Sequence, residues 1–266
     1  MQHVTSRQNP RLREATRLVA SSRDRRKAGK CVLEGEHLVA AYATRHGAPE
    51  TLIVTEDALA RADARTLAER YAERTLVVAA SLFGELATLP AGVGMLAVVE
   101  TPAPRAHGHA DFCLLLDDVQ DPGNVGSMLR SAAAAGVAQA LLSKRCAFAW
   151  SPKVLRAGQG AHFAIDIHED VDLPAWAAAY GAAGGDVIAT VATGGTDLYA
   201  ASLAGRVALA IGNEGAGLSP ALLARATQRV SVPMPGGVES LNAAAAAAVC
   251  LFECVRQRAA RGGATA

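Results

Sequence analysis

The sequence has few aromatic residues and no long apolar segment. Phe, Trp and Tyr together make up 4% of its 266 residues, so surfaces that bind flat ligands by ring stacking must be scarce. Gly, Pro or charged residues interrupt each apolar stretch before it reaches the length of about 18 residues that a membrane-spanning helix needs. The first residues, MQHVTSRQNPRLRE, lack the apolar core of a secretion signal. We therefore expect a cytoplasmic protein that does not insert into a membrane.

Cysteine and histidine are too scattered to suggest a disulfide framework or a metal site. The five cysteines, at positions 31, 113, 146, 250 and 254, are odd in number and form no Cys-x-x-Cys pair. The seven histidines show no His-x-x-x-His spacing. We expect no bound metal, and we expect Cys250 and Cys254 to pack in a core as small hydrophobic side chains.

The net charge is only +1, but it is unevenly distributed. Residues 1–30 contain nine Lys or Arg and only two acidic residues, whereas the remainder of the chain carries more acidic than basic residues. A basic segment on an acidic protein is typical of a module that binds a polyanion. A solvated, arginine-rich helix face would give the same pattern, so charge alone leaves both interpretations open.

Two α/β regions are predicted, separated by a linker at residues 101–110, TPAPRAHGHA. Apolar content of 51% supports a packed core in each. In the first region we expect strands near residues 31–33, 51–55, 76–80 and 95–100, with helices at 10–22, from about 34 onward, and at 58–71. In the second we expect strands at 112–119, 138–143, 186–192, 206–212 and 229–234, a short one within 162–169, and helices at 124–135, 152–157, 176–183, 220–226 and 240–258. Alternating strands and helices predict a mostly parallel, doubly wound sheet for residues 111–266.

Three loops of the second region follow predicted strands and carry unusual residues. They are DDVQDPGNVGSMLRSAAAAG from residue 117, AIGNEGAGLS from residue 210 and VSVPMPGGVESLNAAAAAAVCLFE from residue 230. We expect Asn124 and Ser240 to cap the helices that follow the first and third loops. The second loop reads G-x-x-G-x-G, which is neither the dinucleotide fingerprint G-x-G-x-x-G nor a P-loop. An oxidoreductase that binds a dinucleotide on a doubly wound sheet is therefore disfavoured.

Taken together, the three loops resemble the three motifs of the SpoU (TrmH-like) RNA ribose 2′-O-methyltransferases of the SPOUT superfamily. The matching residues are Asp121-Pro122-x-Asn124-x-Gly126-x-x-x-Arg130, Ile211-Gly212-x-Glu214-Gly215-x-Gly217, and Val232-Pro233-Met234 through Ser240-Leu241-Asn242. The segment SPKVLRAGQGAHF from residue 151 is also similar to the family, with Gln159 as a departure. The resemblance implies a catalytic domain at residues 111–266 with a C-terminal trefoil knot.

The resemblance also implies a cofactor, S-adenosylmethionine, and a set of residues that bind it. By analogy with the family, the pocket comprises Thr190, Gly212, Gly215, Gly217, Val232, Met234 and Leu241. The implied catalytic residues are Arg130, Asn124, Glu214, Ser240 and Asn242. A guanidinium is a poor base, so we expect Arg130 to bind the phosphate next to the ribose and to polarise the 2′-oxygen. In this family the site is assembled across a homodimer, which allows Arg130 to serve the cofactor of the partner chain.

Residues 1–100 resemble, more loosely, the L30-like RNA-binding domain that often precedes this catalytic domain, through VTSRQNPRLRE and VLEGEHLV. This resemblance implies that the basic N-terminus binds the phosphate groups of RNA. The candidate contacts are Arg7, Arg11, Arg23, Arg25 and Arg26. The scarcity of aromatic residues favours recognition of folded RNA by shape. The resemblance favours ribosomal RNA as the target. A transfer RNA target and an RNA-binding protein that has lost catalysis remain alternatives.

Overall fold

The computed structural model describes residues 1–86, 93–105 and 108–263, which form two compact units. One unit comprises residues 1–102 and 150–163, and the other comprises residues 103–149 and 164–266. The expected linker, where it is described, is neither helix nor strand. Residues 150–163 were expected in the second region, and the structure groups them with the first.

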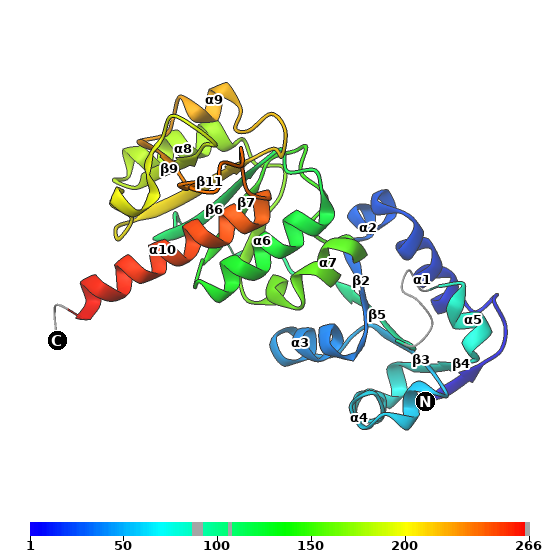
Figure 1. The fold of residues 1–266 in the computed structure, drawn as a ribbon. Helices are drawn as coiled ribbons and strands as arrows, with labels where there is room; N and C mark the ends of the chain where they lie inside the picture. The colour runs from blue at the N-terminus through cyan, green and yellow to red at the C-terminus, as the bar shows by residue number, and fades with distance from the viewer. Residues whose placement is uncertain (87–92, 106–107, 264–266) are drawn as a thin grey trace. The chain divides into compact units, whose positions relative to one another are not determined.

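The first unit is an α/β layer structure around a five-stranded sheet (Figure 1). Its strands run in the order β1-β4-β3-β5-β2, with β1, β4 and β3 parallel and β5 antiparallel to both of its neighbours. The strands are β1 (Gln2–Val4), β2 (Lys30–Glu34), β3 (Thr51–Thr55), β4 (Thr75–Val78) and β5 (Met95–Glu100). The helices are α1 (Pro10–Ala20), α2 (Ser22–Ala28), α3 (Glu36–His46), α4 (Ala62–Arg70), α5 (Ala80–Gly84) and α7 (Pro152–Gly158), with short 3-10 turns at Ala58–Ala60, Ala72–Arg74 and Ala161–Phe163.

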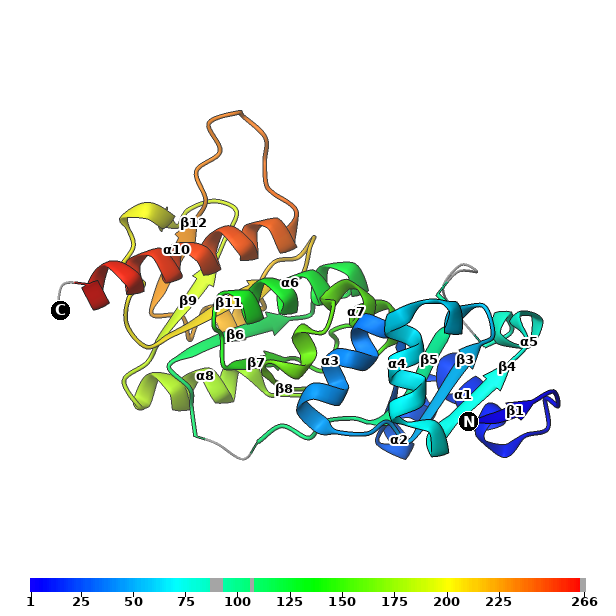
Figure 2. The same ribbon diagram turned by 90° about the horizontal axis from the view of Figure 1, so that it is seen from below.

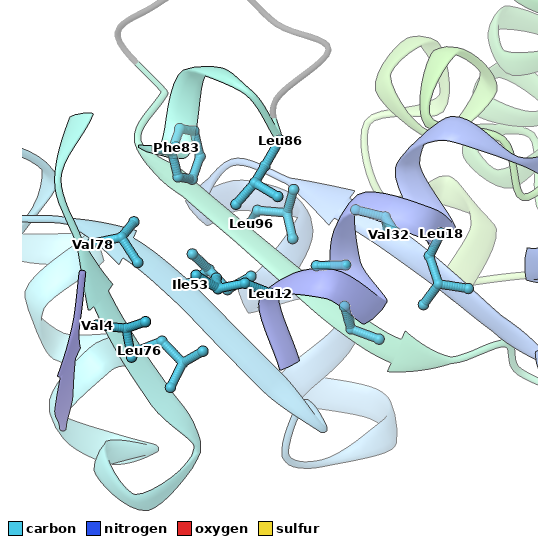
Figure 3. Packing of buried hydrophobic residues seen from close by; sticks show 12 residues of the cluster. Val4, Leu12, Leu18, Val32, Ile53, Leu76, Val78, Phe83, Leu86 and Leu96 are labelled. Carbon is cyan, nitrogen blue, oxygen red and sulfur yellow. The ribbon is translucent and has the colours of Figure 1, made fainter. Parts of the chain in front are cut away.

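The core of this unit lies between α1 and one face of the sheet. Leu12, Ala15 and Leu18 share one side of α1 and are almost completely buried. They pack with side chains from β2, β3, β4 and β5 in a single apolar cluster (Figure 3). Because side chains alternate along a strand, Ile53 points to this cluster while Leu52 and Val54 are buried on the side of α3 and α4. Helices α1 and α4 therefore cover opposite faces of the sheet.

Two expected helices of the first unit are shorter than their sequence pattern predicts. The helix predicted at residues 10–22 ends at Ala20, because the Ser21 side chain accepts a hydrogen bond from the Asp24 amide and starts α2. The helix predicted at residues 58–71 is interrupted at Arg61, whose backbone is extended and whose side chain pairs with Glu36. The strand and helix expected near Glu34 are confirmed as β2 and α3.

The second unit contains a seven-stranded sheet in the order β10-β12-β9-β11-β6-β7-β8, and each described strand pair in it is parallel. Its strands are β6 (Phe112–Asp117), β7 (Gln139–Leu142), β8 (Asp166–His168), β9 (Asp186–Thr190), β10 (Thr196–Asp197), β11 (Val207–Gly212) and β12 (Gln228–Ser231). Its helices are α6 (Pro122–Ala134), α8 (Leu173–Ala182), α9 (Pro220–Leu223) and α10 (Ala243–Gly263), with a 3-10 turn at Leu198–Ala200.

Helices cover both faces of this sheet, as a doubly wound fold requires. Figures 1 and 2 show α6 and α10 on one face and α8 and α9 on the other. On the α8 side, Leu173, Ala177 and Tyr180 pack on β6, β9 and β11. Both faces of β6 and β11 are buried, which explains why these strands read as continuous apolar runs. The predicted mostly parallel sheet is confirmed, whereas the trefoil knot stays a prediction.

Candidate active site

Three loops meet at the carboxyl edge of the seven-stranded sheet. Strands β6 and β11 are neighbours, and their last residues, Asp117 and Gly212, lie opposite each other. Strands β7 and β8 extend the sheet on one side of β6, while β11, β9 and β12 extend it on the other. The strand order therefore reverses beside β6, and in open α/β sheets such a point is where ligands bind.

A cavity of about 370 Å³ opens between these loops. All seven predicted cofactor-binding residues line it: Thr190, Gly212, Gly215, Gly217, Val232, Met234 and Leu241. Its other walls are partly apolar, from Val191, Ile211 and Val230. Two carboxylates, Glu214 and Glu239, also line it, so the cavity combines apolar surface, exposed backbone and negative charge.

The turn after β11 closes tightly because Gly212 has no side chain. A Cβ atom at this position would lie 2.2 Å from the carbonyl carbon of Gly217 and 2.3 Å from the amide nitrogen of Leu218. The turn is held by paired backbone hydrogen bonds between Asn213 and Gly217, at 3.0 and 2.9 Å. Gly217 adopts φ = +70°, a conformation that favours glycine. Two of the three glycines are thus required by the backbone itself.

Three of the predicted catalytic residues are joined in one hydrogen-bonded chain. The Asn124 side-chain Nδ2 donates to Glu214 Oε1 at 2.9 Å, and the Asn242 side-chain Nδ2 donates to Asn124 Oδ1 at 3.0 Å. The backbone amides of Gln120 and Asp121 also point at the Glu214 carboxylate, at 3.5 and 3.3 Å. This chain links the first, second and third motifs.

The Glu214 carboxylate is stabilised in its ionised form. Partial burial by itself would raise the pKa of Glu214, but hydrogen bonds from Asn124 and from backbone amides outweigh it and lower the pKa below its usual value. The carboxylate therefore stays charged to lower pH than an ordinary glutamate. It acts in this structure as an acceptor that holds the first-motif loop.

Two expected helix caps are wrong. Asp121 caps α6 by accepting a hydrogen bond from the Asn124 amide at 2.7 Å, which leaves the Asn124 side chain free to bind Glu214. Asn242 caps α10, since its Oδ1 accepts from the amides of Ala244 and Ala245 at 2.9 and 3.2 Å. Ser240, which was expected in that role, lies before the helix and lines the cavity instead. The third loop turns into the helix two residues later than its sequence suggests.

Arg130 is not brought to the cavity. It lies on α6 six residues after Asn124, which places it about 120° around the helix from that side chain. Its guanidinium is exposed, and it forms no hydrogen bond or ion pair with the residues that the structure describes. Its predicted role therefore needs a substrate or a second chain.

The arginines predicted to contact RNA differ in how exposed their side chains are. Arg23 and Arg26 are exposed on α2, and Arg7 is exposed but pairs with Glu85. Arg11 is partly buried and donates to Thr51 Oγ1 at 3.1 Å. These positions remain predictions as RNA contacts.

The prediction that Arg25 contacts RNA is wrong. Its side chain is only 5% exposed and donates to the carbonyl oxygens of Leu18 and Val19, at the end of α1. The charge therefore fixes the junction of α1 and α2 from inside the unit, and this position cannot contact a phosphate.

Asn213 and Asp118 also belong to the site, although the sequence pattern did not predict them. Asn213 contacts the loop after β6 through its side chain, and Asp118 has an unusual backbone with φ = +59°. Both lie inside the motif loops, but nothing in their local pattern distinguishes them from neighbouring turn residues. Their partners are distant in the chain and appear only in the folded structure.

The described residues were compared with the requirements of a metal site and of a membrane-spanning helix. Within the described ranges, no three His, Cys, Asp or Glu side chains gather as a metal-binding group. Over the same part of the chain, each helix is too short or too polar to cross a bilayer.

Comparison with known families identifies both units. Residues 111–252 match the model of the SpoU rRNA Methylase family, and residues 9–97 match the MRM3-like substrate binding domain. The first match covers the seven-stranded sheet and the three loops. The second runs from the residue before α1 to the middle of β5 and so covers most of the basic N-terminal unit.

Individual relatives resemble the chain over nearly its full length. It is 31% identical to the 23S rRNA (guanosine(2553)-2′-O)-methyltransferase RlmP of Bacillus subtilis, over 95% of this chain and 98% of that protein. It is 33% identical to the 23S rRNA (uridine(2479)-2′-O)-methyltransferase of Streptomyces viridochromogenes, over 96% and 92% of the two chains. The crystal structure of the SpoU methyltransferase AviRb from Streptomyces viridochromogenes with AdoMet superposes with a TM-score of 0.83 at 30% identity, covering 95% of this chain and all of that one.

The corrected cap can be tested by comparing two neighbouring substitutions. Asn242→Ala removes the acceptor for two amides of α10, so the free energy of unfolding should fall by about 1 kcal/mol. Ser240→Ala removes no cap and should change it by less than about 0.5 kcal/mol. Urea denaturation followed by circular dichroism measures both. An equal loss in the two variants would contradict the assignment of Asn242 as the cap.

Proposed function

The chain belongs to the SpoU rRNA methylase family and is an S-adenosylmethionine-dependent RNA ribose 2′-O-methyltransferase, and from this premise we propose that its target is a structured region of ribosomal RNA. The observation that carries the proposal is the likeness of both units, not only the catalytic one, to two 23S rRNA methyltransferases. A cytoplasmic location is part of the same proposal.

The cavity beside β11 fits the chemistry of S-adenosylmethionine. The close approach of the Gly212–Gly217 backbone leaves peptide groups at the wall, and Val232 and Leu241 add apolar surface for an adenine ring. The carboxylates of Glu214 and Glu239 complement a ligand that carries positive charge. When bound, the cofactor supplies a methyl group activated on a sulfonium. We assign the seven predicted residues to its binding.

The residues around the cavity act mainly by positioning. Asn124, Glu214 and Asn242 tie the three loops together, so the acceptor hydroxyl meets a wall whose geometry is fixed before it arrives. Ser240 lines the same cavity and can orient the nucleotide by a hydrogen bond. Arg130 binds the phosphate next to the ribose and polarises the 2′-oxygen, because a guanidinium donates several hydrogen bonds in a fixed plane.

The protein works as a homodimer in this proposal, with Arg130 completing the site of the partner chain. Support comes from Arg130, which is exposed on α6 and is not among the residues that line the cavity of its own chain. On α10, which packs beside α6, the aromatic side chain of Phe252 is 49% exposed and can be covered by a second chain. Light scattering at micromolar concentration should give twice the mass of one chain, and a monomer would contradict the shared site.

The target is tested by methyl transfer in vitro. Purified protein is incubated with labelled S-adenosylmethionine and either ribosomal RNA or transfer RNA from cells that lack this gene. We expect label in ribosomal RNA, recovered after nuclease digestion as one 2′-O-methylnucleoside. Label in transfer RNA alone would overturn the proposed target. Cofactor binding without transfer to any RNA would identify a catalytically inactive RNA-binding protein.

Substitution of Arg130 should separate catalysis from cofactor binding. Arg130→Ala removes a contact to the substrate, so kcat should fall at least about 100-fold while the Kd for S-adenosylmethionine changes less than about threefold. Arg130→Lys keeps the charge but loses the planar donor pair, and it should remain impaired by at least about tenfold. Arg225→Ala, at an exposed arginine beside α9, is the matched control. Near-normal turnover by Arg130→Ala would remove this residue from the mechanism.

Charge removal on α2 should weaken RNA binding without affecting the cofactor. Arg23 and Lys27 are exposed there, and the double substitution to Gln should weaken RNA affinity about 3- to 10-fold at moderate salt. The slope of log affinity against log salt should also fall by about 1 to 2. The matched control is Arg65→Gln with Arg70→Gln on α4, which covers the opposite face of the sheet. Equal losses in the two double variants would contradict an RNA surface on α1 and α2.

A further inference from the structure

Asn213 lies between the two central loops of the site and uses every polar atom that it has. Its backbone pairs with Gly217, closing the turn after β11. Its side-chain Oδ1 accepts hydrogen bonds from the amides of Gly215 and Ala216, at 3.0 and 2.9 Å. Its Nδ2 donates in a different direction, to the carbonyl oxygen of Asp118 at 2.9 Å. One side chain thus serves both the turn and the loop after β6.

The acceptor of this last bond is itself held in an unusual conformation. Asp118 has φ = +59°, which costs free energy in a residue other than glycine. Its amide donates to Ser143 Oγ at 2.8 Å, and Ser143 Oγ donates back to Asp118 Oδ1 at 3.1 Å. Arg145 pairs with the other carboxylate oxygen. The surrounding contacts therefore fix the direction of the Asp118 carbonyl that meets Asn213.

The same two loops carry Asn124 and Glu214. Their contacts form a series: the Ser219 amide donates to Asp117 at 2.8 Å, Asn213 donates to Asp118, and Asn124 donates to Glu214. The Asn213 bond is the middle one. Asn213, like Glu214, is itself a residue that lines the cavity.

We propose that Asn213 is a positioning residue for methyl transfer. The hydrogen bond from its Nδ2 to the Asp118 carbonyl holds the turn after β11 against the loop after β6. This contact keeps Glu214 within hydrogen-bonding distance of Asn124. Its Oδ1 has a separate task, which is to fold the turn that lines the cofactor cavity. The inference rests on the proposed cofactor and substrate, and it adds a residue that acts through others without touching the reacting atoms.

Two substitutions at this position separate the two tasks. Asn213→Asp keeps an oxygen for the amides of Gly215 and Ala216 but replaces the donor to Asp118 with a second acceptor, so the turn persists and the link between the loops is lost. Asn213→Ala removes both. Ser143→Ala loosens the same link from its other side, because it removes the two hydrogen bonds between Ser143 and Asp118.

The experiment measures the Kd for S-adenosylmethionine by calorimetry, and kcat at saturating cofactor and ribosomal RNA, with wild-type protein as the reference. For Asn213→Asp we expect a Kd within about threefold of wild type and a kcat at least about 30-fold lower. For Asn213→Ala we expect the Kd to rise at least about tenfold as well. Ser143→Ala should lower kcat about fivefold with little change in Kd.

The matched control is Asp172→Asn, the reverse exchange of carboxylate and amide at the exposed cap of α8, where one side-chain oxygen accepts from the Ala175 amide. Both constants should stay within about twofold of wild type there. Wild-type kcat in both Asn213→Asp and Ser143→Ala would overturn the inference. So would a loss of cofactor affinity in Asn213→Asp as large as its loss of kcat, because that result would mean a purely structural role in the turn. Absence of turnover in the wild-type protein would instead contradict the proposed function.

Discussion

The close contact of two backbone segments at Gly212 is the constraint on which the site depends. Any side chain at this position would collide with the peptide that joins Gly217 to Leu218, so the turn after β11 can close only around a glycine. Because the turn closes there, Asn213 and Glu214 form hydrogen bonds with the first-motif loop and α6, and both residues line the cavity together with Gly215 and Gly217. The wall of the cavity and the contact with the first motif are therefore consequences of the same tight turn.

The two units differ in the charge and the shape of the surfaces that they offer to a ligand. The catalytic unit offers a cavity with exposed backbone and two carboxylates, which suits a small cationic ligand. The N-terminal unit presents exposed Arg and Lys side chains on α1 and α2, which suits a phosphate backbone. Arg25 is not part of this basic surface. It is buried, and its side chain stabilises the junction of α1 and α2 from inside the unit.

The sequence predicts those features of the fold and the site that repeat locally. Continuous apolar runs predicted β6 and β11, and the resemblance of the glycine-bearing motif to the family predicted the loop that lines the cavity. The caps at Asp121 and Asn242 were not predicted, because several Ser, Asp and Asn residues near each helix start can serve as a cap. Only the folded backbone shows at which of them the helix begins. The contact between Asn213 and Asp118 joins residues 95 positions apart, so no local pattern could reveal it. The buried state of Arg25 depends in the same way on packing that charge counting ignores.

We propose that this enzyme places a 2′-O-methyl group on ribosomal RNA. The decisive measurement maps ribose 2′-O-methylation across total RNA from cells with and without the gene, and from deletion cells that carry the Arg130→Ala variant. We expect one methylated ribose in ribosomal RNA to disappear on deletion and not to return with the variant. An unchanged ribosomal RNA map, or a loss confined to transfer RNA, would contradict it.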